Sequence, residues 1–495
     1  MSTELVNVIF GMKVRQARTA AGLTQAELAA AADLSPSYLT EIEKGRKYPR
    51  ADKILRMADA LDKEYDELVS IKLGPSLAYL ERALASPLLQ DFPFEEFGLD
   101  ASDVVALLTQ APDKASALLH AILEIGRQYD LGEEHFLRAV LRSHQEIHDN
   151  YFPDIEEAAA EFAQAHQLDA ALPLPLETLQ SILVNEYDYQ IDTERLAAEP
   201  ALSGYRAVYV PTRRPRLLVN SRLRPRQIKF LLAREMGYHH LQLAERSAMS
   251  SPERVDSFRQ VLNDFKASYF AGALLMPRQP LLDELQTLFQ QSRWQPERLT
   301  AMLARFEVTP EMLFYRFSEL VPEFFGLKLH FLRMHRSDGR YRLIKRLNMN
   351  QLPIPSGLAL YEHYCRRWLS TRLLRETESQ AVSWSQPLVG VQQSEFLESG
   401  DRYLCLGFAR PLVLQPGVFS SVVVGFRYDA QLPEVVAFVH DAAVPSVVIN
   451  ETCERCPLTA EQCTVRAAPP TRLAQAQRVA ERRQALNQLM AEFRG

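Results

Sequence analysis

The sequence has little cysteine, no long apolar run and no excess of positive charge. Only 5 of its 495 residues are cysteines, and all of them lie from Cys365 onward. This excludes a fold held together by disulfides and predicts thiols or metal ligands, as expected in a cytoplasmic protein. No apolar stretch is long enough to span a membrane, and the N-terminus does not resemble a signal peptide. We therefore expect a cytoplasmic protein without a membrane partner.

Charge and length narrow the class of protein further. The formal net charge is -6, so any binding to a polyanion must come from a local basic patch. At 495 residues the chain should form several domains, and a hydrophobic content of 47% is ordinary for a globular protein. We expect a multidomain protein with its chemistry in separate regions.

The most informative stretch lies near the N-terminus and predicts two short helices separated by a turn. Thr24 is a good N-cap for the first helix, and Glu27 three residues later completes a capping box. Ser35 caps the second helix, and Pro36 follows at its first position, where the missing N–H costs nothing. Gly45 then ends the second helix. This pattern is typical of a helix-turn-helix.

The second of these helices suits DNA recognition. Leu39 and Ile42 share one face and should pack inward, which turns the opposite face outward. A helix of this length fits the major groove, and the basic residues that follow it suit phosphate contacts. The segment resembles the Cro/repressor-type (XRE) helix-turn-helix over its whole length. From the charge pattern and that resemblance, the candidate DNA-contacting residues are Gln25, Ser35, Ser37, Tyr38, Thr40, Lys44 and Arg46. The alternative is a small helical bundle with a solvated basic loop.

Helical and strand patterns divide the chain into five parts. Residues 1–70 should form an all-α helix-turn-helix domain, and 71–150 a helical connector with no recognisable chemistry. Residues 151–320 should form an α+β unit, and 321–470 an α+β sensory domain with an antiparallel sheet. The end of the chain, 471–495, reads as a charged helix suited to packing or oligomerisation.

Strands are expected in both α+β units. In the first unit, 181–192 and 206–220 alternate enough to be strands. In the sensory domain the expected strands are 327–334, 341–348, 402–414, 419–428 and 433–440. A helix between the two units should carry Tyr361, Tyr364, Cys365 and Trp368.

Two long helices of the first α+β unit resemble the core of the ImmA/IrrE family, whose fold is that of zinc metallopeptidases. The family's second helix carries an acidic ligand before an A-N-x-F-A-x-x-L-L-M-P pattern, and this chain matches well from Asp264 to Pro277. The first helix departs where the family has H-E-L-G-H, because Arg234 and Tyr238 replace both zinc-binding histidines. We therefore expect the metallopeptidase-like fold to be kept and its chemistry to be lost, so that the protein is not an enzyme.

The residues left in this core suggest a structural role. Glu235 and Asp264 could pair with Arg234 and hold the two helices together. The opposing hypothesis is an active metallopeptidase that cleaves a repressor partner, which would need zinc on His239 or His240. Both histidines are displaced from the required helix face by about 100° per residue.

Arginines crowd the approach to the same core. An arginine-rich wall suits a phosphate-bearing ligand. The candidate ligand-binding residues are Arg213, Arg214, Arg216, Arg224 and Arg226. The alternatives are a solvated basic face or a second contact to DNA.

The cysteines near the C-terminus form the second informative motif. Cys453, Cys456 and Cys463 combine C-x-x-C spacing with a proline after the second cysteine, which is typical of a soft-ligand site. An iron–sulfur cluster, a structural zinc, a thiol redox switch and unliganded cysteines all remain open. A fourth ligand would come from Cys365, Cys405, a histidine or a small molecule.

Taken together, the order of these parts resembles the short-chain fatty-acyl transcriptional regulators. The ending C-x-x-C … C … R-x-x-P-P, with Arg466, Pro469 and Pro470, belongs to that pattern. The resemblance implies a regulator of propionate- or acetate-type acyl-CoA metabolism, with an acyl-CoA or CoA as effector and, in some members, an iron–sulfur cluster. We expect a homodimer or homotetramer on a double-stranded DNA operator. An iron–sulfur or thiol redox-sensing regulator is the alternative.

Overall fold

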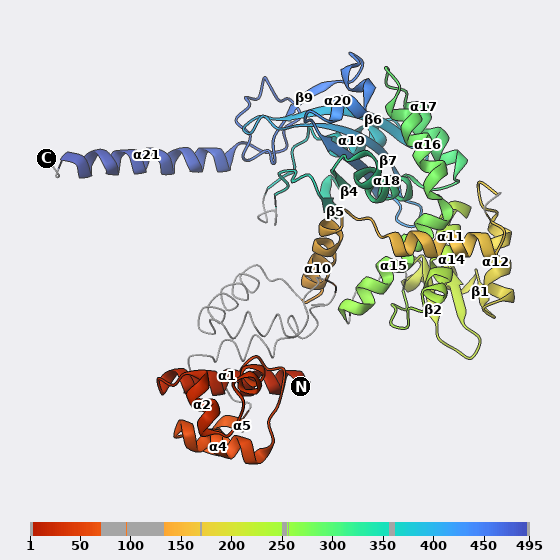
Figure 1. The fold of residues 1–495 in the computed structure, drawn as a ribbon. Helices are drawn as coiled ribbons and strands as arrows, with labels where there is room; N and C mark the ends of the chain where they lie inside the picture. Colours follow the sequence, from red (N-terminus) through yellow and green to blue (C-terminus); the bar gives the residue numbers. More distant parts are fainter. Residues whose placement is uncertain are drawn as a thin grey trace. The chain divides into compact units, whose positions relative to one another are not determined.

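The computed structural model describes residues 3–70, 96, 133–168, 171–249, 255, 257–355 and 362–492. The chain divides into two compact units, which we call unit 1 (1–144 with 254–261) and unit 2 (145–253 with 262–495). Figure 1 traces their elements in chain order. The helical connector was predicted over 71–150. Apart from residue 96, its part from 71 to 132 lies outside the described residues. Most of the remainder, 133–150, is helix α10 (Glu133–Ile147).

The N-terminal domain of unit 1 is a small all-helical bundle. Its helices are α1 (Thr3–Ala20), α2 (Gln25–Ala31), α3 (Pro36–Glu43), α4 (Ala51–Leu61) and α5 (Tyr65–Val69). In α4 the buried residues Ile54, Met57, Ala58 and Leu61 follow helical spacing, which explains why this segment turns one face to the core. Gly11 marks a close crossing of α1 and α3, because a Cβ there would lie 2.2 Å from the Ile42 carbonyl oxygen.

The first half of unit 2 combines helices with a small sheet. The helices are α11 (Pro153–Ala165), α12 (Leu176–Asn185), α13 (Arg195–Ala198), η3 (Pro200–Leu202), α14 (Pro225–His240), α15 (Phe258–Leu275), α16 (Arg278–Phe289), α17 (Pro296–Arg305) and α18 (Pro310–Phe325). The strands β1 (Gln190–Asp192), β2 (Ala207–Val210) and β3 (Arg216–Val219) form a sheet in the order β1-β3-β2.

The strand predicted over 181–192 is largely wrong, whereas strands within 206–220 are confirmed. Residues up to Asn185 belong to helix α12, and only Gln190–Asp192 form a strand. Leu179, Ile182 and Leu183 are buried at helical spacing, so one apolar face packs inward as a helix. The short apolar run was compatible with either period, and burial against α14 decided it.

The second half of unit 2 is built on a six-stranded sheet. Its strands are β4 (Leu329–Ser337), β5 (Arg340–Asn348), β6 (Leu388–Phe396), β7 (Arg402–Pro411), β8 (Phe419–Arg427) and β9 (Ser446–Ile449). The order is β5-β4-β8-β7-β6-β9. All neighbours are antiparallel except β6 and β9, which run parallel. The predicted antiparallel sheet is therefore confirmed, with two strands that were not predicted, β6 and the parallel edge strand β9.

Two sequence expectations for this half are wrong. The strand predicted over 433–440 is instead the pair of short helices α20 (Leu432–Val435) and η4 (Ala437–His440). Asp429 accepts the backbone N–H groups of Gln431 and Leu432, which favours a helical start there. The helix predicted around Tyr364 is α19 (Leu369–Ser379), which begins later, after Trp368. Tyr364 instead forms an isolated bridge with Thr452, and Tyr361 lies outside the described residues.

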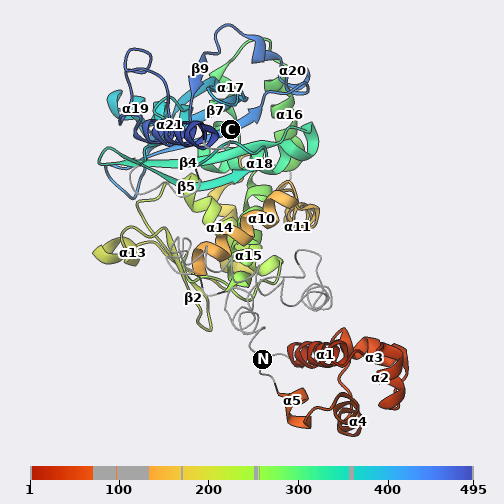
Figure 2. The same cartoon turned by 90° about the vertical axis from the view of Figure 1, so that its left-hand side faces the viewer.

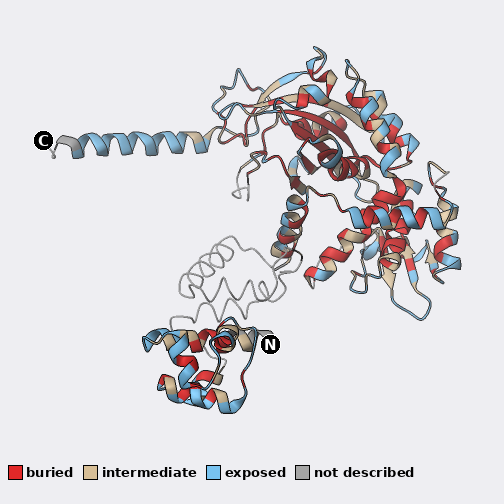
Figure 3. Ribbon diagram, in the orientation of Figure 1, coloured by how far each residue is buried: buried red, intermediate tan, exposed pale blue. Residues whose placement is uncertain are grey.

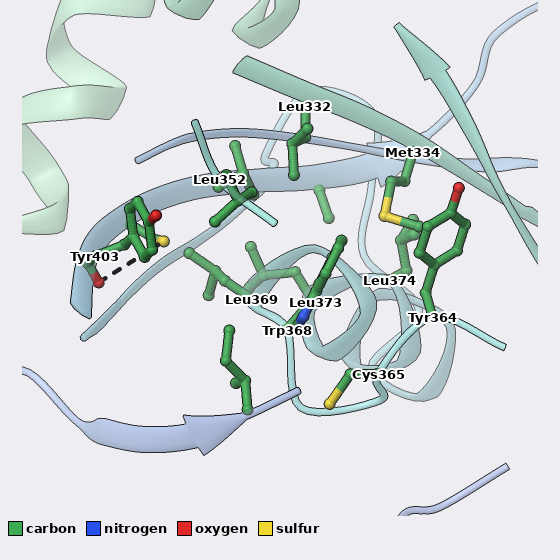
Figure 4. Packing of buried hydrophobic residues seen from close by; sticks show 14 of the residues in the cluster. Leu332, Met334, Leu352, Tyr364, Cys365, Trp368, Leu369, Leu373, Leu374 and Tyr403 are labelled. Carbon is green, nitrogen blue, oxygen red and sulfur yellow. Dashed lines mark hydrogen bonds between the residues drawn. The ribbon is translucent and has the colours of Figure 1, made fainter. Parts of the chain in front are cut away.

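Both faces of the large sheet are covered by helices. Helix α18 contacts β4 and β8 (Figure 2). Phe408 of β7 packs on Phe314 of α18. Helix α19 covers the opposite face. Alternate residues of a strand point to opposite sides of a sheet, and in β7 Phe408 contacts α18 whereas its neighbour Gly407 approaches α19. Figure 4 shows the core beneath α19, with Leu369 and Leu373 among its residues. At Gly407 a Cβ would lie 2.7 Å from Leu373, so α19 approaches the sheet closely.

The C-terminal helix α21 (Thr471–Glu492) lacks a buried face in unit 2. Figure 3 shows it exposed along nearly its whole described length. Its larger apolar residues, Val479, Leu486, Leu489 and Met490, are all exposed. Among the helices in the described parts of the chain, none combines the length and apolar character needed to cross a membrane.

Candidate functional site

The candidate recognition helix α3 is positioned by its cap and by its buried side. Ser35 Oγ accepts a hydrogen bond from the Tyr38 N–H at 3.1 Å, and Pro36 occupies the first turn. Leu39 and Ile42 are fully buried in the domain core. The caps and packing predicted from sequence are therefore confirmed, and the opposite side of α3 faces solvent.

The predicted base-contacting side chains lie along that solvent-facing side. Ser35 and Ser37 are exposed, and their hydroxyl oxygens lie 3.1 Å apart. Thr40 is partly buried and donates its hydroxyl proton to the Pro36 carbonyl at 2.8 Å. Its methyl group and one acceptor position remain for a base edge. Tyr38 is also partly buried.

The basic residues after α3 are free to approach a phosphate backbone. Lys44 and Arg46 are exposed. Arg46 makes only a loose contact with Glu41, at 3.5 Å, and exposed pairs of this kind are weak. Lys47 lies 5.5 Å from the Tyr38 ring centroid.

Gln25 takes part in a buried network that the sequence did not reveal. Glu43 is buried and binds Arg18 through two hydrogen bonds, of 2.6 and 3.1 Å. The Gln25 amide donates to the same carboxylate at 2.7 Å. Arg18 and Glu43 are far apart in sequence and follow no spacing rule, so only the fold brings them together. The network orients α3 against α1 and α2, and it leaves Gln25 less free than Ser37.

In the IrrE-like core an arginine lies among the residues that replace the zinc ligands. Arg234 Nη2 lies 2.8 Å from Tyr238 Oη and 3.3 Å from Asp264 Oδ1. Tyr238 donates its hydroxyl proton to Asp264. Burial raises the pKa of Tyr238 well above its ordinary value, so the phenol keeps that proton. The predicted pairing of Arg234 with Asp264 is confirmed, and the guanidinium supplies the positive charge of this cluster.

Glu235 does not pair with Arg234 as predicted. Its carboxylate accepts from Arg246 at 2.6 Å and from the Tyr189 hydroxyl at 2.9 Å. Burial alone would lower the pKa of Arg246, but the hydrogen bond and charge of Glu235 outweigh it and raise that pKa. The Arg246 guanidinium also lies 3.7 Å from the ring centroid of Tyr209. Adjacent residues of a helix point in different directions, which explains the separate partners.

The two neighbouring histidines do not assemble a metal site. His239 Nε2 lies 2.8 Å from the Tyr189 hydroxyl, and burial lowers the pKa of His239. His240 packs against the rings of Phe162 and Phe270 instead. In the part of the chain that the structure describes, no group of three or more His, Cys, Asp or Glu side chains could hold a metal.

The arginines predicted to bind a ligand lie mostly at the surface and do not converge. These are Arg213, Arg214, Arg216, Arg224 and Arg226, of which only Arg226 is partly buried. Arg214 pairs with Asp188 at 3.1 Å, with both side chains well exposed. Arg224 lies 6.0 Å from the ring centroid of Trp384. None of the five lines the cavity described next.

A cavity of about 210 Å³ lies between α14, α15 and α18 on one side and β4, β5 and β7 on the other. We call it the arginine cavity, because Arg206, Arg333 and Arg410 line it together. A second cavity of about 190 Å³ shares Arg206, Gln227 and Arg333 with it and continues toward residues 412–415. The shared residues mark the junction between the two.

Positive charge exceeds negative charge at this junction. Arg410 pairs with Glu311 at 2.5 Å, and Arg333 Nε lies 3.4 Å from Ser420 Oγ. The Arg206 guanidinium has no hydrogen bond or close ion pair with any described residue, and the buried Arg410 Nε has no hydrogen-bond partner there. Three guanidinium groups therefore face one carboxylate.

The pKa values of the residues at the junction show the same excess of positive charge. Burial, followed by the positive charges of Arg333 and Arg410, lowers the pKa of Arg206 to about 10. Burial would raise the pKa of Glu311, but Arg410 and Arg333 outweigh it and hold that pKa far below its usual range. His335, which lines the second cavity, has its pKa lowered to about 4 by burial and by Arg333, so it is neutral at pH 7. An anion entering here would find unsatisfied donors.

The rest of the arginine cavity has a mixed lining of apolar residues, polar residues that include Lys345, and a buried ion-pair group. Its apolar lining comprises Phe230, Leu231, Met276, Met312 and Phe331. In the ion-pair group, Arg316 binds Glu156 at 2.5 Å and Glu319 at 2.9 Å. Burial raises the pKa of Glu319 to about 7, despite the opposing charge of Arg316.

The sequence did not single out the residues of this cavity. Arg206, Arg333 and Arg410 come from three separate segments, and Arg206 alone lies among the arginines of the 206–226 stretch. A possible signal was an arginine next to an apolar run in each of two strands, Arg333 in the middle of β4 and Arg410 near the end of β7. A charged residue at such a position needs a buried partner or a ligand.

The predicted metal-binding cysteines are buried next to a fourth thiol. Cys453, Cys456 and Cys463 are at most 8% exposed. Two backbone hydrogen bonds hold Cys365 near these cysteines. The Cys365 N–H donates to the Glu451 carbonyl, and the Cys453 N–H donates to the His363 carbonyl. Burial raises the pKa of Cys365 to about 11, and Cys453 and Cys456 are close enough to add to that rise.

Other contacts organise the cysteine loop. The Ala467 N–H donates to Cys453 Sγ at 3.4 Å. The Arg466 guanidinium donates to the carbonyls of Leu458 and Cys456, which ties the loop together. Cys405 lies apart, in the core under α19, where its thiol lies 3.7 Å from Ser394 Oγ. The thiols have the chemistry of a soft-metal site, but no three of them are gathered within the described residues as a metal would require.

Comparison with known proteins identifies two of the domains. The helix-turn-helix family model matches residues 14–68, and the model of the IrrE N-terminal-like domain matches residues 189–318. Both resemblances noted in the sequence are thus confirmed.

Similarity to known proteins also extends beyond these two domains. The chain is 24% identical over 353 residues to the HTH-type transcriptional regulator RamB of Mycobacterium tuberculosis, in strain CDC 1551 / Oshkosh and in strain ATCC 25618 / H37Rv. That match covers 66% of this chain and 68% of RamB. A solved structure of a Mycobacterium tuberculosis transcriptional regulator aligns with a TM-score of 0.46 and 18% identity, over 66% of this chain and 92% of that one. The chain therefore combines a helix-turn-helix domain with an IrrE N-terminal-like domain and is homologous to the RamB regulators.

Proposed function

We propose that this protein is a DNA-binding transcriptional regulator whose operator binding is modulated by a short-chain acyl-CoA or CoA held at the arginine cavity. The observation that carries the proposal is the group of Arg206, Arg333 and Arg410 facing the single carboxylate of Glu311. The exposed side of α3 and the similarity to RamB, itself a transcriptional regulator, support the DNA-binding part.

The chemistry of the two joined cavities suits an anionic thioester. Unpaired guanidinium groups bind phosphate or carboxylate oxygens strongly, because their donors are already desolvated and fixed. Beyond the arginines, Phe230 and Phe331 offer an apolar passage for an acyl chain. Each cavity, of about 210 or 190 Å³, is smaller than a usual ligand pocket of about 300–1,000 Å³, so the ligand would need both. We infer that they hold the acyl-pantetheine part, with the nucleotide toward 412–415.

The position of the cavity suggests how binding could reach DNA. Its walls come from helices of the IrrE-like domain and from strands of the large sheet, so a bound ligand contacts both. A ligand that binds better to one arrangement of these parts shifts the population toward it. In a homodimer or homotetramer, that shift would change the spacing of two recognition helices relative to a pseudo-palindromic operator.

Calorimetry on anaerobically purified protein tests the ligand. We expect saturable binding of propionyl-CoA and CoA. Arg206→Gln and Arg333→Gln should each weaken binding by about 10- to 150-fold, since a hydrogen bond to a charged group is worth about 1.5–3 kcal/mol. Arg213→Gln is the matched control, because that arginine is exposed and lies outside the cavity. No binding by the unmodified protein, or an equal loss in the control, would contradict the proposal.

Gel-shift titration tests the DNA-reading helix. Ser37→Ala and Thr40→Ala should weaken binding to the operator far more than binding to unrelated DNA, because base contacts carry the specificity. Lys44→Gln should weaken both by a similar factor, as expected for a phosphate contact. Equal losses on both DNAs for Ser37→Ala would remove that residue from base recognition.

The buried cysteines support a second candidate function, an iron–sulfur or zinc site or a thiol redox switch. Two observations support it. Cys365 lies close to Cys453 and Cys456, and the Ala467 N–H donates to Cys453 Sγ. No three of these thiols are gathered in the described structure, so a metal would have to draw Cys365, Cys453, Cys456 and Cys463 together, and they would lose their protons on binding it. Iron and zinc analysis with a visible spectrum should show metal that Cys453→Ser removes and Cys405→Ser retains. Metal-free protein without redox response would exclude this function.

A further inference from the structure

The helix that forms one wall of the arginine cavity carries a glycine that its own packing does not need. Ser268 and Gly272 of α15 and Met276 directly after it lie four residues apart, so one face of the helix lines the cavity. Glycine is one of the least favourable residues inside a helix. Its presence at this position therefore calls for a reason.

The usual reasons for a helical glycine are absent at Gly272. A Cβ there would meet Glu319 Oε2 at 3.7 Å and Arg316 Cδ at 3.9 Å, which are ordinary contacts. Gly237 on α14 is different, because a Cβ there would lie 3.0 Å from Phe270 and 3.1 Å from the Ala267 carbonyl. Gly237 is thus explained by close helix packing, whereas Gly272 leaves space that opens into the cavity.

A buried ion-pair group lies next to Gly272. Arg316 donates to the Met276 carbonyl at 3.3 Å and binds both Glu156 and Glu319, and all three charged residues are buried. An acyl chain pushed further would have to break these contacts, and separating a buried ion pair is strongly unfavourable. The space above Gly272 is therefore the last that an apolar chain can use.

From these contacts we propose that Gly272 sets the length of the acyl chain that the arginine cavity accepts. The inference rests on the proposed function, since it assumes an acyl-CoA with its polar part at Arg206 and Arg333. The chain then runs past Phe230 and Phe331 and ends at Gly272. A methyl group at that position shortens the cavity without straining the fold.

The test is calorimetry with CoA, acetyl-, propionyl-, butyryl- and hexanoyl-CoA on the full-length protein. Gly272→Ala should leave the affinity for CoA unchanged. It should weaken the longest acyl-CoA that the unmodified protein binds well by about 10- to 200-fold, the usual effect of one misfitted methylene. The preferred chain should become shorter.

Glu157→Ala is the control. Glu157 is exposed on α11 and lines neither cavity, so this variant should keep the original preference. Met312→Ala is the converse variant, because it enlarges the apolar passage and should favour longer chains. A melting temperature recorded for each variant shows that it is folded.

The outcomes separate the two ideas. If the unmodified protein binds neither CoA nor any acyl-CoA, the proposed function fails. If it binds them and Gly272→Ala and Met312→Ala both leave the chain-length preference unchanged, the proposed function stands and the role of Gly272 is refuted. An equal loss of CoA and every acyl-CoA in Gly272→Ala would also refute a role in chain length.

Discussion

Two arginine clusters in unit 2 differ in what they can do. In the IrrE-like core, Arg234 and Arg246 are matched by Asp264 and Glu235 and packed on aromatic rings. In the arginine cavity, the guanidinium groups of Arg206, Arg333 and Arg410 share the carboxylate of Glu311 next to open space. A buried arginine therefore indicates a ligand only where its charge is unmatched and there is room. The first cluster holds helices together, and the second suits binding.

The largest expected effect is a difference in the free energy of unfolding between variants of the two clusters. Arg234→Met should destabilise the protein by about 3–5 kcal/mol, because Asp264, whose side chain is only 15% exposed, then keeps its charge without its cation. Arg206→Met should change stability by less than about 1 kcal/mol or raise it, since it removes repulsion from Arg333 and Arg410. Urea unfolding followed by circular dichroism measures both. A larger loss for Arg206→Met would overturn the distinction between the clusters.

A smaller effect concerns pH and the inner end of the cavity. Burial raises the pKa of Glu319 to about 7, above the ordinary value of 4.5. The folded protein therefore holds a proton that the unfolded chain has released, so this group makes stability fall as pH rises from about 4.5 to 7. Glu319→Gln should remove that contribution.

Melting temperatures between pH 4.5 and 8 provide the measurement. The difference between the unmodified protein and Glu319→Gln isolates this group from His330 and His335, whose lowered pKa values act in the opposite direction. Glu297→Gln, at an exposed position in the first turn of α17, serves as the control. Parallel curves for the unmodified protein and Glu319→Gln would show that Glu319 is ionised throughout.

The smallest effect is expected at the surface arginines. Arg214→Gln removes an exposed pair with Asp188 and should change stability by about 0–1 kcal/mol, because such pairs are screened by water and salt. Chemical unfolding in low and high salt measures it. A loss above about 2 kcal/mol would mean that this arginine has buried partners in the assembled protein.

Local features of the sequence predicted the DNA-binding domain well. The caps Thr24 and Ser35, the proline after Ser35 and the apolar pair Leu39 and Ile42 act within a few residues of one another. Such contacts depend little on the rest of the chain, so the pattern alone indicates helices, turn and exposed face. The Arg18–Glu43 network was missed because its members meet only across the bundle.

Unit 2 was predicted less completely. The loss of both zinc-ligand histidines was visible in the sequence, and so was the pairing of Arg234 with Asp264. The partner of Glu235 was predicted wrongly because Arg246 lies in a loop that no periodicity describes. The segments 181–192 and 433–440 were assigned as strands because short apolar runs fit either period.

The sequence by itself determined the helix-turn-helix, the IrrE-like core without its zinc ligands, and the presence of a cysteine cluster. Each of these depends on residues close together in the chain or on one motif. Only the tertiary structure decided which arginines are unmatched, because Arg206, Arg333 and Arg410 come from distant segments and their charge balance depends on burial. It also decided that Gly272 faces open space while Gly237 is enclosed, since a missing Cβ has meaning only in terms of its neighbours.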